Sequence, residues 1–113
     1  MTKVGEGKDL PEKTIIERSR KDLDVVTEKF QNTLQSYETS AADSEKKEHL
    51  KAIMDQQLLL IRSAVNEIKR GGMHKQEALL EKHYKAYMQK SSPEGFSALE
   101  HDIATLRDYN EIP

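Results

Sequence analysis

Cysteine is absent from this chain of 113 residues, and glycine and proline are scarce, with five and three residues. Without cysteine the chain can form no disulfide, no thiolate metal site and no cysteine nucleophile. No apolar run approaches the roughly 18 residues that a membrane-spanning helix requires. The segment Met1 to Gly7 also lacks the apolar stretch of a signal peptide. These absences predict a cytoplasmic protein that makes no contact with a membrane.

Charge of one sign is also missing, since 18 basic and 20 acidic residues give a formal charge of -2. Such a balance provides no general attraction to nucleic acid. Charged residues nevertheless make up 34% of the chain and hydrophobic residues 35%, a composition typical of long amphipathic helices. The sign varies locally, because residues 72–90 carry four positive and two negative charges whereas 94–111 carry one positive and five negative.

The apolar spacing and the helix-start signals predict four helices, over about residues 11–37, 44–70, 73–90 and 93–110. Asp9 followed by Pro11 is a helix start, and Pro93 after two serines is another. Gly71-Gly72 is expected to supply a left-handed cap at the end of the second helix. Residues 1–9 are expected to form a flexible tail, and residues 10–113 a single helical domain.

The predicted helix lengths indicate how the helices pair. The first two are nearly equal in length and separated by a short link, which favours a long antiparallel hairpin. The last two form a shorter hairpin that can cover only about two-thirds of the long one. The predicted fold class is therefore all-α, a small antiparallel bundle of three to four helices.

The second helix carries the strongest apolar pattern in the chain. Its seam repeats at alternating spacings of four and three residues, through Leu50, Met54, Gln57, Ile61, Ala64 and Ile68. Leu58 and Leu60 flank the seam, and Leu59 points away from it. Packing within a bundle explains a wide apolar face, but it does not explain Leu59, so a partner surface is predicted here.

No pattern in the sequence predicts catalysis or a cofactor. The four histidines lack the spacing to acidic residues that zinc proteases or di-iron bundles need. No phosphate-binding glycine loop or nucleophile motif is present, and no carboxylate stands in an apolar setting that would raise its pKa. We therefore expect no enzyme activity, no metal or other cofactor and no small-molecule substrate.

The helix over 73–90 mixes lysines with Tyr84, Tyr87 and Met88, which superficially suggests a nucleic-acid surface. It has no arginine, and Glu77 and Glu81 weaken its positive potential, so protein contact is favoured over nucleic acid. For Tyr84 and Tyr87, simple packing in the core is an equal alternative. The predicted partner-binding residues are Leu58, Leu59, Tyr84, Tyr87 and Met88.

The end of the chain, from Leu99-Glu100-His101-Asp102 through Arg107 to Pro113, is acidic. It resembles the acidic C-terminal signals of bacterial type IV secretion effectors over about the last 20 residues. The resemblance implies, as a minor alternative, a small secreted bacterial effector or a regulator of one.

The leading prediction is a non-enzymatic protein-protein interaction module that binds and regulates a larger partner, as an inhibitor, an adaptor or a chaperone would. The alternative is a structural homodimer in which the helices over 44–70 pair to form a larger bundle. The predicted partner is thus another protein, a second copy of the chain, or both.

Overall fold

The computed structural model describes residues 12–41 and 44–111, and all the regular structure in these ranges is helical. The four helices are α2 (Glu12–Thr39), α3 (Glu45–Ile68), α4 (Met73–Gln89) and α5 (Pro93–Glu111). Each begins and ends within two residues of its predicted bounds, so the all-α prediction is confirmed. The predicted tail over 1–9 and the helix start at Asp9 and Pro11 lie outside the described residues.

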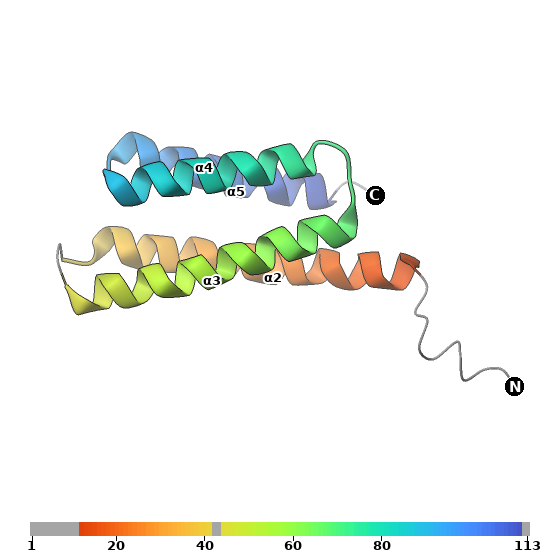
Figure 1. Ribbon diagram of the computed structural model, residues 1–113, viewed down its shortest axis with the longest axis horizontal. Helices are drawn as coiled ribbons and strands as arrows, with labels where there is room; N and C mark the ends of the chain where they lie inside the picture. The colour runs from red at the N-terminus through yellow and green to blue at the C-terminus, as the bar shows by residue number, and fades with distance from the viewer. Residues whose placement is uncertain (1–11, 42–43, 112–113) are drawn as a thin grey trace, which may run out of the picture.

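The helices form two antiparallel hairpins that lie one against the other (Figure 1). The hairpin of α2 and α3 has 28 and 24 residues in its helices, and the hairpin of α4 and α5 has 17 and 19. Besides the partner in its own hairpin, α2 neighbours α5 and α3 neighbours α4. The arrangement is an up-down-up-down bundle in which none of the described residues covers one face of the long hairpin.

One hydrophobic core runs through the bundle and receives side chains from all four helices. From α2 and α3 it contains Leu23, Val26, Phe30, Leu34, Tyr37, Met54, Leu58, Ile61, Ala64, Val65 and Ile68. From α4 and α5 it contains Met73, Leu80, Tyr84, Tyr87, Leu99, Ile103 and Leu106. Of the predicted seam of α3, Leu50 and Gln57 are only partly buried, and the side-chain amide of Gln57 donates a hydrogen bond to Thr33 at 3.2 Å.

Serine side chains cap the first turns of α3 and α5. The hydroxyl of Ser44 accepts a hydrogen bond from the backbone amide of Lys47 at 3.1 Å, and that of Ser92 accepts one from Gly95 at 3.0 Å. Both bonds go to amides of the first helical turn, which lack the carbonyl four residues earlier that an amide inside the helix would bond. They explain why these helices begin where the sequence predicts.

The turn between α3 and α4 corrects one sequence prediction. The left-handed residue that ends α3 is Lys69, with φ 57° and ψ 37°, and not Gly71. Gly72, with φ 86°, is the second left-handed residue and precedes the first turn of α4. The chain must reverse within this short span because Ile68 and Met73, at its two ends, both lie in the core. The helix therefore stops two residues earlier than its composition indicates.

The last turn of α5 is tied to the rest of the bundle by two arginines. Arg20 Nε of α2 donates to the carbonyl of Asn110 at 3.0 Å, and Arg70 Nη1 donates to the carbonyl of Tyr109 at 2.5 Å. In return, Asn110 Nδ2 donates to the carbonyl of Arg20 at 2.8 Å. Carbonyls at a helix C-terminus lack donors within the helix, so these contacts hold the last turn of α5 against the bundle.

Candidate functional site

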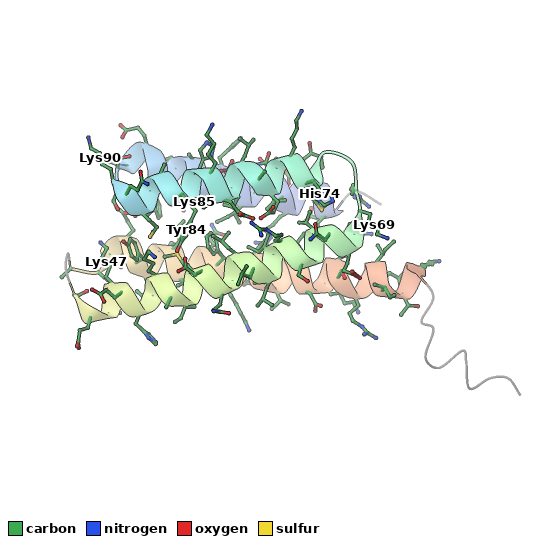
Figure 2. The ribbon with its side chains drawn as sticks, viewed as in Figure 1. Lys47, Lys69, His74, Tyr84, Lys85 and Lys90 are labelled. Carbon is green, nitrogen blue, oxygen red and sulfur yellow. The ribbon has the colours of Figure 1, made fainter. Side chains whose placement is uncertain are left out.

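Four of the five predicted partner-binding residues line one groove of about 470 Å³ between α3 and α4, which we call the α3–α4 groove. They are Leu58, Leu59, Tyr84 and Met88. Figure 2 shows Tyr84 and Lys85 on the side of α4 that faces α3. The groove is thus built from the parts of the two helices that the sequence singled out.

The apolar part of the groove contains side chains at three depths. Leu58 is buried in the core, Met88 is partly buried against it, and Leu59 is 56% exposed. Successive residues of a helix point about 100° apart, so Leu58 can pack inward while Leu59 stands at the rim. Leu59 and Met88 therefore form an apolar surface that no other described residue covers.

Tyr84 forms the polar floor of the groove. Its hydroxyl donates to Asp55 Oδ1 at 2.7 Å, and its ring lies against Phe30 with the ring centres 6.0 Å apart. Burial, and then the hydrogen bond to Asp55, raise the pKa of the Tyr84 hydroxyl, so it stays protonated and remains a donor. Tyr84 therefore acts first as a core residue, as the alternative interpretation of the sequence expected.

Tyr87 does not line the groove. It is 1% exposed, its ring is tilted against those of Tyr37 and Phe96, and its hydroxyl donates to Glu38 of α2. These contacts connect three helices within the bundle. A partner on the surface cannot reach this ring, so Tyr87 leaves the set of candidate contact residues.

Charged side chains border the groove, and its acidic ones have partners within the chain. Asp55 accepts from Tyr84 and lies 3.5 Å from Lys51 Nζ. Glu81 binds Arg62 of α3 through both carboxylate oxygens, one of them 2.9 Å from Arg62 Nε. The hydrogen bonds from Arg62 lower the pKa of Glu81. Lys85 lies beside Glu81 and is exposed.

Glu77 of α4 is a buried carboxyl group that the sequence analysis missed. It is 6% exposed and follows the core spacing of Met73, Leu80 and Tyr84. Burial, together with a hydrogen bond to Glu81, raises its pKa to about 8. The expectation that no carboxylate stands in an apolar setting is therefore wrong. The spacing of the apolar residues in the sequence indicates that position 77 is buried, because it falls four residues after Met73 and three before Leu80.

A second buried carboxylate joins α4 to α5. Asp102 lies 2.5 Å from His83 Nδ1 through Oδ2, and its Oδ1 accepts from Gln76 at 3.0 Å. The contact fixes the ring of His83, which remains partly exposed. Within residues 12–41 and 44–111, no group of three His, Cys, Asp or Glu side chains could hold a metal ion.

Two other grooves open on the surface. One, of about 780 Å³ between α2 and α5, is lined by polar and charged side chains, including Arg18, Arg20 and Asp24, and it offers no apolar anchor. The other lies between α2 and α3 on the uncovered face of the long hairpin.

None of the helices described here is both long enough and apolar enough to cross a membrane. Comparisons with protein-family models, with curated proteins and with solved structures found no match to the chain.

Proposed function

We propose that the chain is a non-enzymatic binding module that holds an amphipathic helix of a larger partner protein in the α3–α4 groove, and that it regulates the partner by doing so. The observation that carries the proposal is the exposure of Leu59 directly beside Leu58 and Met88. Grooves of this kind receive apolar side chains spaced three and four residues apart on a bound helix.

The apolar surface supports a binding role on energetic grounds. Leu59 leaves more than half of its surface in water, and covering it with a partner would contribute about 1 to 2 kcal/mol. Methionine adapts its shape to different neighbours, and Met88 stands at the border of the core where a partner side chain could insert. The buried residues Leu58 and Tyr84 give these two a fixed support.

The charges indicate the flanks of the bound helix. Asp55 and Glu81 are engaged by Tyr84 and Arg62, whereas Lys85 projects from the exposed side of the groove. Acidic side chains beside the apolar stripe of the partner would therefore be attracted to this rim. Such pairs contribute more to the association rate and to specificity than to affinity.

The test is photo-cross-linking from position 59. A photoreactive phenylalanine analogue replaces Leu59 in one protein and Lys82, which is exposed and outside the groove, in a control protein. In extracts of the cells that make the chain, we expect a cross-link from position 59 to one helical segment with an apolar stripe and acidic flanks. The cross-link should disappear when Met88→Glu is added.

A synthetic peptide of the cross-linked segment then gives the affinity by fluorescence anisotropy. Leu59→Glu should weaken peptide binding at least about tenfold, whereas Leu79→Glu, at an exposed leucine outside the groove, should leave it unchanged. Equal cross-linking from positions 59 and 82, or equal affinity of the two leucine variants, would reject the proposal.

A further inference from the structure

The uncovered face of the long hairpin contains a second apolar groove, of about 460 Å³, which we call the α2–α3 groove. Val26 and Ala64 are buried in its floor, and Val25 and Leu60 stand on its walls with 51% and 60% of their surfaces exposed. Figure 1 shows the hairpin of α4 and α5 on the opposite side of α2 and α3. No described part of the chain covers this groove.

Charges of opposite sign stand at the two ends of the same groove. On α2, Asp22 and Lys29 both line it, seven residues and therefore roughly 10 Å apart, with Val25 and Val26 between them. On α3, Glu67 lines the end that holds Asp22. The hydrogen bond from Gln57 to Thr33 shows that these two residues lie side by side. Because α2 and α3 run antiparallel, Glu67, which is ten residues after Gln57, lies beside about residue 23 of α2.

This charge order is complementary to itself under a two-fold rotation. Positions 22 and 29 are equally distant from the midpoint between positions 25 and 26. If two copies of α2 cross antiparallel with the axis at that midpoint, Val25 of each copy meets Val26 of the other. Each Lys29 then faces Asp22 of the other copy, with Glu67 beside it. A symmetric dimer requires this kind of self-complementary patch.

The contact face of this arrangement lies at the lower size limit of specific dimers. With the axis at the midpoint between positions 25 and 26, the 28 residues of α2 overlap their copy along about 42 Å, whereas α3 overlaps its copy only over residues 61–68, along about 12 Å. At a helix width of about 10 Å, the contact can bury about 500 Å² on each copy, or roughly the 1,000 Å² in total that a specific interface requires. A strip of apolar side chains with charged residues at its ends also matches the usual composition of interfaces.

We infer that the occupant of the α2–α3 groove is a second copy of this chain, and that the two long hairpins pack face to face as a two-fold symmetric dimer with Lys29 of each copy on Asp22 and Glu67 of the other. The inference does not rest on the proposed function, because it uses the opposite face of α3. The dimer leaves both α3–α4 grooves open.

The test is sedimentation at micromolar concentration with charge-reversal variants at exposed positions. The full chain should sediment as a dimer, and Asp22→Lys and Lys29→Asp should each weaken the dimer at least about tenfold, because each places like charges opposite one another. A mixture of the two variants should associate again, since the lysines at positions 22 and 29 of one chain then face the aspartates at positions 29 and 22 of the other.

Apolar variants provide the second arm. Leu60→Glu should yield a folded monomer, whereas Leu79→Glu, at an exposed leucine on α4, should remain a dimer. A monomeric wild-type chain would overturn the inference. So would a dimer that survives Leu60→Glu, or charge-reversed chains that stay monomeric when they are mixed.

Discussion

Leu59 and Leu60 are consecutive residues of α3 and both are more than half exposed, yet they line different grooves. Leu59 stands at the rim of the α3–α4 groove with Tyr84 and Met88, and Leu60 stands on the wall of the α2–α3 groove with Val25. Successive residues of a helix point about 100° apart, so the two side chains face different neighbouring helices. One apolar run of α3 therefore serves two surfaces, for which we propose two different occupants.

Glu77 should make the stability of the fold depend on pH. In the folded chain its carboxyl group keeps its proton up to about pH 8, whereas in the unfolded chain it loses the proton near pH 4.5. Between these values unfolding releases a proton, so a rise in pH favours the unfolded state. The stability that the neutral carboxyl group provides is thus fully present below about pH 4.5 and is lost as the pH rises through about 8.

Glu77→Gln should remove this dependence, because the amide is neutral at every pH and can still donate to Glu81. Relative to the wild type, we expect the variant to gain roughly 2 kcal/mol of unfolding free energy between about pH 5 and pH 8, measured by urea denaturation. Glu48→Gln, at an exposed position of α3, is the control and should show no such gain. If the unfolding free energies of Glu77→Gln and the wild type differed by the same amount at all pH values, the raised pKa of Glu77 would be contradicted.

Tyr84 and Asp55 should be energetically coupled across the α3–α4 groove. Removing the hydroxyl with Tyr84→Phe breaks the 2.7 Å hydrogen bond to Asp55 and should lower the unfolding free energy by about 1 kcal/mol. Asp55→Ala should have a similar effect, and the double variant should lose little more than either single one. Lys51→Met is a control, because exposed ion pairs contribute little. Strict additivity of the two single variants would show that the bond does not contribute.

Gly72 should not tolerate a side chain. Its φ of 86° is unfavourable for alanine, and an added Cβ would come within 3.0 Å of the Tyr109 hydroxyl. Gly72→Ala should therefore lower the melting temperature, by an amount that corresponds to roughly 1 to 2 kcal/mol. Gly71→Ala is the matched control, since a Cβ there meets no atom within 4 Å. Equal melting temperatures for the two variants would argue against this geometry of the turn.

Asn110 should hold the end of α5 against α2. Asn110→Ala removes the donor to the Arg20 carbonyl, and the last turn should open more often, at a cost of about 1 to 3 kcal/mol. Hydrogen exchange measured by mass spectrometry should then be faster in the C-terminal peptide of α5 and unchanged in α4. Glu111→Gln, at an exposed neighbour, should leave both peptides unaffected. Unchanged hydrogen exchange in Asn110→Ala would contradict the prediction, because it would mean that Arg20 and Arg70 alone hold the last turn of α5.

The helices could be predicted from the sequence because they depend on local signals. Ser44 and Ser92 cap the turns that they precede, and the spacing of apolar residues marks the core face of each helix. The end of α3 at Lys69 was not predictable in this way. It depends on where Ile68 and Met73 enter the core, and this is a property of the packed bundle.

The candidate groove was predictable only in part. Leu59 was identified because it departs from the seam, and this departure needs no knowledge of the fold. The different positions of Tyr84 and Tyr87 could not be separated from sequence, because both fall on the core side of α4 and only the packing of α2 and α3 decides which lines a groove. Glu77 was missed because its charge outweighed its spacing in the interpretation of the sequence.

The most direct test of two separate surfaces compares Leu59→Glu with Leu60→Glu in the same two assays. We expect Leu59→Glu to lose the partner peptide and to remain a dimer in sedimentation, and Leu60→Glu to become a monomer that binds the peptide with unchanged affinity. If the two variants lose the same property, or if neither loses any, the account of α3 as a helix with two binding faces is contradicted.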